Sequence, residues 1–579
     1  MTETATRNAV TTPAARPLPP APPEADPILT EVIRQSLNAA ALQMRQAFVR
    51  TSFSPIIYEV YDFACAIYDA EYRLLSQALG LQHFMGRLSF CVALAVEAVG
   101  GEEKLEPGDI LLYNVPYGTG AHAQDAAIVM PVYHGGKIVG YTAIKAHWLD
   151  IGGKDPYSTD TVDVFQEGTI FPGVKLCRAG VMVDDIMRMV TANSRVPHLV
   201  AGDLQAEIVG VRTGAAALAE LIEKYGADVF WASVARMFAH GESVVRSYFR
   251  EIPDGVYTAS GELDDNGVET DRIPFEISMT VDGSDVTVDF SKSPGMQAGP
   301  VNCPLPGTIA ATRVAVMMLA GGGEAPNEGH FAAVNVITRP GTMFHPEAPA
   351  PCFLYGWPAI QAIEVIFRAI ADARPKGVPA GSGGCVCSLV WWGEREETGE
   401  PWADGAPYPI GLGAHPDGDG GNTLMHIAQT AARTSPAEVF EARYPLRILQ
   451  SDFGQDSGGA GRHRGGLGLD MDFLALEDCL LTSVFERTKN APWGLRGGLE
   501  ARPNASTLRL PDGTLQVLGK KTRVKVPRGA TLEIRTGGGG GHGSPAERDP
   551  QSVLDDVRDG YISEGAARAD YPHAFEERR

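Results

Sequence analysis

Two strand-like segments on either side of a Gly-Gly pair constrain the fold more than any other feature of the sequence. Residues 126–133 read AAIVMPVY and residues 137–146 read KIVGYTAIKA, and both are rich in β-branched and aromatic residues. Gly135 and Gly136 between them suit a two-residue turn, because that turn needs positive φ at both positions. We therefore expect an antiparallel hairpin. Pro131 predicts that its first strand lies at an edge or carries a bulge.

Two His-x-x-Asp units flank this hairpin at its open end, one on each strand. The segment His122–Asp125 reads HAQD and precedes the first strand, and the segment His147–Asp150 reads HWLD and follows the second. Two imidazoles and two carboxylates at one end of a hairpin can form the ligand shell of a divalent metal. Zn²⁺, Mn²⁺ or Fe²⁺ suits this mixture better than Ca²⁺, which takes mostly oxygen ligands. Polar groups satisfied at strand ends are the alternative, and the spacing alone does not decide between the two.

The expected pairing brings the two units together but divides their side chains between two faces. With the glycine pair as the turn, Asp125 lies opposite Ala146. His147 then lies opposite Gln124. Strict alternation places His122 and His147 on one face and Asp125 on the other, so Asp125 joins the imidazoles only if the chain bends before the first strand.

Glu59 is a further carboxylate candidate. It lies in the segment YEVYD at residues 58–62, just before a buried strand expected at residues 63–68. A surface or ion-pair role is more common for a glutamate considered alone.

The rest of the sequence predicts a mixed α+β chain with a helix-and-hairpin N-terminal half and a β-rich C-terminal region. Its 579 residues allow about three domains at roughly 100–200 residues each. Apolar residues recur every three or four positions from Asp26-Pro27 to about Phe53, which predicts a capped helix. A second hairpin is expected near Glu276–Phe290. We expect, in chain order, a disordered tail at 1–25, an N-terminal α+β domain with the candidate metal site at 26–250, a central α/β domain at 251–434 and a β-rich C-terminal domain with terminal helices at 435–579.

Charge and composition argue against several classes of protein. The 71 acidic residues exceed the 49 basic ones and give a net charge of −22, so the chain repels nucleic-acid backbones. No apolar run reaches the roughly 18–20 residues that span a bilayer, and the first 25 residues lack the apolar core of a secretion signal. Eight sparse cysteines fit reduced thiols in the cytoplasm. We expect a cytoplasmic protein that binds neither nucleic acid nor membranes.

Other motifs give weaker indications. Cys385 and Cys387 form a Cys-x-Cys pair, but without a second pair a structural role is favoured over a metal site. The Gly-rich segments 456–468 and 537–543 match no phosphate-binding motif and are interpreted mainly as tight loops, although the basic run at 462–464 could meet an anion or a partner chain. The sequence contains no GxSxG, Rossmann or Walker motif, so any ATP dependence must come from another chain.

Eight sequence blocks occur in order between residue 26 and residue 550: DPILTEVIRQSL (26–37), RTSFSPIIYEVYDFACAIYDAEYRLLSQ (50–77), PGDILLYNVPYGTGAHAQD (107–125), AHWLDIGG (146–153), FQEGTIFPGVKLCRAG (165–180), SPAEVFEARYPLRI (435–448), DSGGAGRHRGGLG (456–468) and GGGGGHGSPAERDP (537–550). Each block alone is a weak signal, but their joint occurrence is specific. With them the chain resembles the hydantoinase B/oxoprolinase family. That family comprises B-type subunits of N-methylhydantoinases and related cyclic-amide hydrolases, with relatives among acetone and acetophenone carboxylase subunits.

The resemblance implies a heteromeric enzyme, with an α2β2 or larger assembly and a small-molecule substrate. ATP is bound by a separate A-type subunit, which phosphorylates the substrate carbonyl. The B-type subunit then completes the hydrolysis or, in the ketone carboxylases, the carboxylation. The resemblance also implies a divalent metal, which the B-type subunit of the carboxylase relatives holds, and Zn, Mn or Fe is expected here. The matching positions are Glu59, His122, Asp125 and His147.

This chain departs from the family pattern at two points. Many members have His-His-x-Asp where this chain has His147-Trp148-Leu149-Asp150, so a second histidine is lost. The usual His-Leu-Pro-Asp is His122-Ala123-Gln124-Asp125 here, which keeps both ligating residue types. The chain also lacks the extra length associated with acetone carboxylase subunits.

The sequence therefore supports three hypotheses. The leading one is ATP-dependent hydrolysis of a cyclic amide, such as a hydantoin, a lactam or an oxoproline-like ring. In it His147 is catalytic, and Asp150 is either the base or the residue that orients an imidazole ligand. The second is a ketone carboxylase subunit that uses the same site with bicarbonate. The third is a non-enzymatic assembly subunit in which the His/Asp residues are structural.

Overall fold

The computed structural model describes residues 10–13, 15–22, 25–84, 86–321, 323–374 and 377–576. These residues form two compact units. The first comprises the described parts of Met1–Pro156, Thr161–Ser260 and Phe275–Ile366, and the second comprises those of Tyr157–Asp160, Gly261–Pro274 and Phe367–Arg579. Helices and several sheets occur together, which confirms the predicted mixed α+β class. No helix in the described part of the chain is long and apolar enough to pass through a bilayer.

The two units do not follow the domain boundaries expected from the sequence. The segment predicted as a central domain, residues 251–434, contributes to both units. Residues 1–9 of the predicted disordered tail lie outside the described residues. Val10–Pro13 of the same tail form strand β1, which pairs antiparallel with β12 (Val334–Thr338). These four residues of the predicted tail are therefore paired in a sheet, at the edge of which β1 lies.

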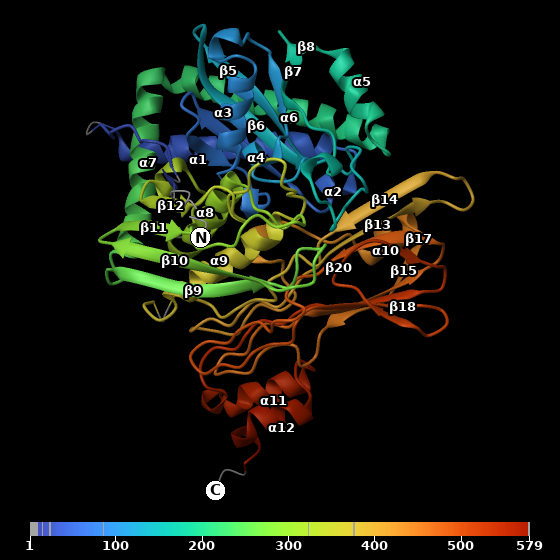
Figure 1. Ribbon diagram of the computed structural model, residues 1–579. Coiled ribbons are helices and arrows are strands. Elements are labelled where there is room, and N and C mark those ends of the chain that lie inside the picture. Colours follow the sequence, from blue (N-terminus) through green and yellow to red (C-terminus); the bar gives the residue numbers. More distant parts are fainter. Residues whose placement is uncertain are drawn as a thin grey trace, which may run out of the picture. The chain divides into compact units, whose positions relative to one another are not determined.

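A seven-stranded antiparallel sheet forms the frame of the first unit (Figure 1). The two longest strands, β5 and β6, lie at its centre and are buried over most of their length. The spatial order is β3-β2-β6-β5-β4-β7-β8. In chain order the strands are β2 (Phe63–Asp69), β3 (Leu74–Gln77), β4 (Ile110–Tyr113), β5 (Asp125–His134), β6 (Lys137–His147), β7 (Pro172–Arg178) and β8 (Val181–Met182).

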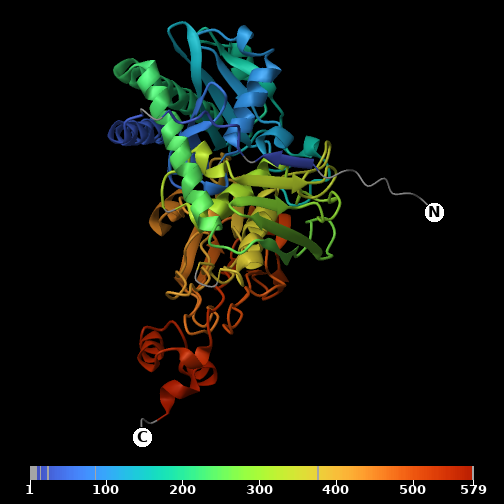
Figure 2. The same cartoon turned by 90° about the vertical axis from the view of Figure 1, so that its left-hand side faces the viewer.

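Helices cover both faces of this sheet. The helices α1 (Pro27–Thr51) and α6 (Pro197–Tyr225) pack together on one face, and α3 (Leu88–Ala98) packs on the other. Asp26 caps α1 as predicted, since its carboxylate accepts hydrogen bonds from two backbone amides of the first turn. Gly210 lets α6 approach the sheet, because a Cβ there would lie 2.3 Å from Ile144. Figure 2 shows the long α7 (Ala227–Phe249), which also packs on α1. Shorter helices are α2 (Pro55–Tyr58), α4 (Pro116–Thr119) and α5 (Asp184–Ala192).

A second, five-stranded sheet lies largely in the first unit, in the order β1-β12-β11-β10-β9. The hairpin predicted near Glu276–Phe290 is confirmed by β10 (Ile273–Asp282) and β11 (Asp285–Asp289), which turn at Gly283. The remaining elements are β9 (Gly255–Leu263), α8 (Leu305–Ala320) and α9 (Gly356–Ile370).

The second unit is β-rich, as predicted. One sheet has the order β14-β13-β17-β20 and the other has the order β15-β16-β21-β18-β19. The strands are β13 (Ser388–Glu394), β14 (Pro401–Ala406), β15 (Leu446–Phe453), β16 (Leu469–Ala475), β17 (Cys479–Val484), β18 (Ala505–Arg509), β19 (Leu515–Val517), β20 (Lys520–Val526) and β21 (Thr531–Arg535), with the helices α10 (Ala437–Arg443), α11 (Pro550–Arg558) and α12 (Glu564–Asp570).

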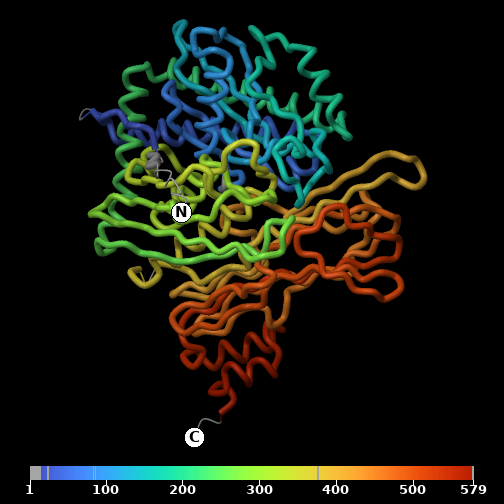
Figure 3. The backbone as a smooth tube through the Cα atoms, in the orientation of Figure 1, coloured from blue at the N-terminus to red at the C-terminus, as the bar shows by residue number. Residues whose placement is uncertain are grey.

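The Gly-rich segments of the second unit have almost no regular secondary structure, and they pack backbone against backbone (Figure 3). The amide of Gly539 donates to the carbonyl of Gly466 at 2.8 Å, and its carbonyl accepts from the amide of Gly459 at 2.8 Å. A Cβ on Gly539 would lie 1.9 Å from the carbonyl oxygen of Leu412. Glycine is therefore required by the close approach of neighbouring chains.

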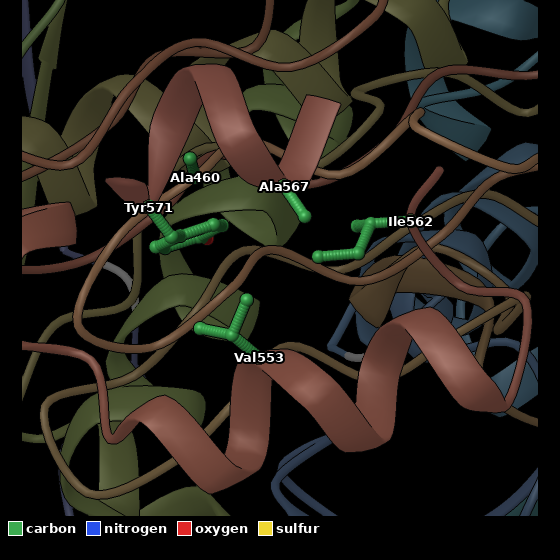
Figure 4. Close-up of a cluster of buried hydrophobic side chains, with 5 residues drawn as sticks. All are labelled: Ala460, Val553, Ile562, Ala567 and Tyr571. Atoms are coloured by element: carbon green, nitrogen blue, oxygen red, sulfur yellow. The ribbon is translucent and has the colours of Figure 1, made fainter. Parts of the chain in front are cut away.

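The C-terminal helices attach to one of these segments through a small apolar core (Figure 4). Val553, Ile562, Ala567 and Tyr571 pack there with Ala460. The Tyr571 hydroxyl also accepts a hydrogen bond from the amide of Gly461 at 3.2 Å. The core thus fixes α11 and α12 beside the segment 456–468.

Candidate metal centre

The central hairpin turns where the sequence predicts, but its register changes along the strands. Gly135 and Gly136 have φ values of 58° and 77°. His134 pairs with Lys137 next to the turn, and a bulge then shifts the register between Val132 and Tyr133. The extra residue of the bulge is Val139 of β6, and β5 lies inside the sheet. The strand that carries Pro131 is therefore neither an edge strand nor the bulged strand, so that prediction is wrong.

The bulge places Asp125 directly opposite His147 rather than opposite Ala146, as the sequence had predicted. Directly paired residues of an antiparallel sheet point to the same face, so Asp125 and His147 face the same way. A tight turn brings in His122, because the amide of Asp125 donates to the His122 carbonyl at 3.2 Å. The bend required before the first strand is therefore present.

Three ligating atoms meet at the end of the hairpin. His122 Nε2 lies 2.9 Å from Asp125 Oδ1 and 3.0 Å from His147 Nδ1, and His147 Nδ1 lies 3.1 Å from Asp125 Oδ1. All three residues are buried: the exposed fraction is 5% for His122, 1% for Asp125 and 3% for His147. They form the group of metal-ligating side chains found among the described residues. We call this group the His-Asp-His triangle.

Hydrogen bonding around His122 favours a cation at the centre of the triangle. Its Nδ1 lies 2.9 Å from the carbonyl oxygen of Phe353, which can only accept, so Nδ1 carries the proton. In the neutral ring Nε2 is a lone pair directed at Asp125 Oδ1 and His147 Nδ1, and in the charged ring Nε2 is a donor to them. While Asp125 is a carboxylate, no placement of protons satisfies all three contacts, whereas one metal ion does. Histidine metal ligands also typically donate the N–H of their other ring nitrogen to a backbone carbonyl, as His122 does to Phe353.

Asp125 is held as a carboxylate on its other side. Its Oδ2 accepts from the Tyr355 hydroxyl at 2.8 Å and lies 3.6 Å from Lys145 Nζ. Burial alone raises the pKa of Asp125, but His122 and Lys145 hold it well below its usual range. Burial in turn lowers the pKa of Lys145 to about 8. Lys145 and Tyr355 were not identified from the sequence.

The buried carboxylate of Glu167 supports the segment that contacts the triangle. Glu167 Oε1 accepts from the amides of Cys352 (2.7 Å) and Phe353 (2.8 Å) and from the Thr161 hydroxyl (3.0 Å). Burial raises the pKa of Glu167 to about 8. Glu167 thereby fixes the segment that carries the Phe353 carbonyl and the Tyr355 hydroxyl.

The structure places Asp62, rather than Glu59, next to the triangle. Glu59 is half-buried at the C-terminal cap of α2, and neither Glu59 nor Asp62 belongs to the group of converging ligating atoms. The carbonyl of Asp62 accepts from the amide of His147 at 3.1 Å. Burial raises the pKa of Asp62 to about 7; the charge of His147 lowers this pKa and the charge of Asp125 raises it. The sequence feature that points to Asp62 is its position just before β2, because β2 pairs with β6 from Phe63 onward.

Asp150 and Trp148 point to other partners. The Asp150 carboxylate accepts from the backbone amide and the guanidinium of Arg195, so Asp150 fixes the loop after β6. The Trp148 indole donates to Glu207 of α6 at 2.6 Å. The absence of a second histidine at position 148 therefore leaves the triangle unchanged, and the catalytic role expected for Asp150 stays a prediction.

Known proteins resemble this chain over nearly its whole length. The family described as hydantoinase B/oxoprolinase matches residues 26–545. An uncharacterized protein of Methanocaldococcus jannaschii is 31% identical over 94% of this chain and 96% of its own length. The putative D-/L-hydantoinase B subunit of Pseudomonas sp. strain NS671 is 29% identical (94% and 95%), and the caprolactamase beta subunit of Pseudomonas jessenii is 26% identical (94% and 96%).

Two solved structures share the fold. The crystal structure of the ATP-dependent caprolactamase from Pseudomonas jessenii aligns with a TM-score of 0.87 and 25% identity, over 96% of this chain and 98% of that one. Nucleotide-free acetone carboxylase aligns with a TM-score of 0.83 and 19% identity, over 95% and 80%.

Proposed function

The chain belongs to the hydantoinase B/oxoprolinase family, and from this premise we propose that it is the B-type subunit of an ATP-dependent enzyme that hydrolyses a cyclic amide. The His-Asp-His triangle carries the proposal. Relatives that are named as a hydantoinase B subunit and a caprolactamase beta subunit support the reaction class. They also support a second polypeptide as partner.

We propose that His122, Asp125 and His147 hold a divalent metal, and that Asp62 adds a carboxyl charge beside them. The donor set fits Zn²⁺, Mn²⁺ or Fe²⁺, because it combines two imidazole nitrogens with a carboxylate. When bound, such a metal supplies Lewis acidity and lowers the pKa of a water molecule. Tyr355 and Lys145 keep Asp125 charged and oriented, and the Phe353 carbonyl fixes the His122 tautomer.

ATP is proposed to act on the partner chain. An unstrained cyclic amide is a poor electrophile, and phosphorylation of its oxygen on an A-type subunit creates a leaving group. The buried residues of the triangle then receive the activated ring away from bulk water. The assembly is proposed to be α2β2 or larger.

Reconstitution with an A-type chain tests the proposal. We expect ATP-dependent ring opening of a hydantoin, a lactam or oxoproline, with loss of turnover in His122→Ala and His147→Ala. His134→Ala is the matched control, since His134 lies at the other end of the same hairpin. Full activity of both triangle variants would contradict the proposal.

Ketone carboxylation is the second candidate, favoured by the fold shared with acetone carboxylase. Uptake of labelled bicarbonate with a ketone substrate would establish it. Ring opening without uptake of label would exclude it.

A further inference from the structure

Arg87 is a fully buried arginine with spare hydrogen-bonding capacity. Its residue surface is 0% exposed, and its Nη1 donates to the carbonyl of Gly120 at 2.7 Å. Its Nε and Nη2 have no hydrogen-bond partner among the described residues. A buried charged donor without an acceptor is costly, so these two N–H groups call for an acceptor that the protein itself does not provide.

Arg87 lies beside the His-Asp-His triangle. Its guanidinium carbon is 4.8 Å from the centre of the Tyr355 ring. The hydroxyl of Tyr355 donates to Asp125, and its ring centre is 5.2 Å from that of His122. A single aromatic side chain therefore separates the guanidinium from the proposed metal ligands.

Lys145 is a second fully buried cation at the same place. Its Nζ is 4.4 Å from the centre of the Phe84 ring, and the guanidinium carbon of Arg87 is 5.5 Å from the same centre. Asp125 attracts Lys145 while Arg87 repels it. Asp125 is the only carboxylate paired with either cation among the described residues. Of the two buried cations, only Lys145 thus pairs with a carboxylate, and that carboxylate also serves the triangle.

We propose that Arg87 and Lys145 form a binding site for a phosphate group next to the triangle. A phosphate dianion offers several oxygens to the free N–H groups of the arginine and balances the excess positive charge. This inference rests on the proposed function, because the phosphoryl group of the activated substrate is the ligand that the reaction would bring to this place. Arg87 would hold the leaving group while the triangle faces the ring.

Titration of the full-length chain with inorganic phosphate, in the presence of Mn²⁺, tests the site by calorimetry. We expect wild-type chain to bind phosphate, Arg87→Met to bind it about tenfold more weakly or worse, and Arg87→Lys to lie between them. Arg195→Met is the control, because Arg195 is an arginine of the same unit that pairs with Asp150. Phenyl phosphate, run in parallel, shows whether an esterified phosphoryl group enters the site or only free phosphate does.

The thermal stability of the variants separates a ligand site from a structural arginine. Because the Arg87 charge lacks a carboxylate partner, Arg87→Met should melt no lower than wild type without phosphate, and phosphate should no longer raise its Tm. Phosphate binding by Arg87→Met that equals wild type, or no binding by wild type, would overturn the site. Phosphate binding without ATP-dependent ring opening in the complex would instead overturn the proposed function and leave the site intact.

Discussion

Asp125 and His147 face each other across β5 and β6, with 3.1 Å between Oδ1 and Nδ1. The β-bulge near the turn creates this pairing, since regular pairing from the glycine turn would place Asp125 opposite Ala146. One extra residue in a strand thus brings a carboxylate and an imidazole to the same face. The turn at His122–Asp125 then completes the triangle.

Asp62 is expected to contribute to metal affinity, and Glu59 is not. Asp62→Asn should lower the affinity for Mn²⁺ by about 10–100-fold, because it removes a carboxyl charge next to His147. Glu59→Gln is the matched control and should bind the metal like wild type. Competition with a chelating dye measures both variants. An affinity loss in the Glu59 variant alone would restore the assignment made from the sequence.

Glu167 is expected to support the triangle through its hydrogen bonds. Glu167→Ala removes the acceptor of the Cys352 and Phe353 amides and should weaken metal binding by about tenfold. Glu167→Gln keeps an acceptor oxygen and should restore most of the affinity. Metal titration of the folded variants is the measurement. Equal metal affinities of the Glu167→Ala and Glu167→Gln variants would show that Glu167 does not position the site.

Glu167 should also affect how stability depends on pH. Burial raises its folded pKa to about 8, above the ordinary value of 4.5. The folded chain therefore binds a proton more tightly than the unfolded chain, and this contribution is present below about pH 4.5 and lost as the pH rises to about 8. Urea unfolding of wild type and Glu167→Gln across this range should show a smaller loss of stability in the variant. An identical slope would mean that Glu167 titrates normally.

The packing of the Gly-rich segments predicts a steric effect at Gly539. A Cβ there would meet the Leu412 carbonyl at 1.9 Å, whereas a Cβ on Gly418 meets nothing within 4 Å. Gly539→Ala should lower the free energy of unfolding by about 1–3 kcal/mol or more, and Gly418→Ala should leave it nearly unchanged. Denaturant unfolding of both variants tests this, and equal stability would contradict the backbone packing.

The sequence predicts the local features of the site and misses the long-range ones. The glycine pair and the β-branched runs identify the hairpin, and the His-x-x-Asp spacing identifies His122, Asp125 and His147. The bulge, whose extra residue lies in β6, has no clear local signal, and Pro131 pointed to the wrong strand. Asp150 looked equivalent to Asp125 in the sequence, but tertiary packing gives it Arg195 as partner.

Contacts between distant segments explain the other omissions. The Tyr355 hydroxyl and the Phe353 carbonyl reach the triangle from more than 200 residues away along the chain. Glu167 supports them through a third segment. The Gly-rich segments form one packed layer only because several of them meet in space. No local pattern encodes such neighbours, whereas caps, turns and strand periodicity depend on adjacent residues.

The number of metal ions bound per chain tests the central claim most directly. Metal-free full-length chain would be titrated with Mn²⁺, and bound metal would be counted for wild type, His122→Ala, His147→Ala and the control His134→Ala. We predict one tightly bound ion per chain for wild type and for the control, and none for the two triangle variants. Absence of bound metal in wild type, or the same binding in the triangle variants, would contradict the account.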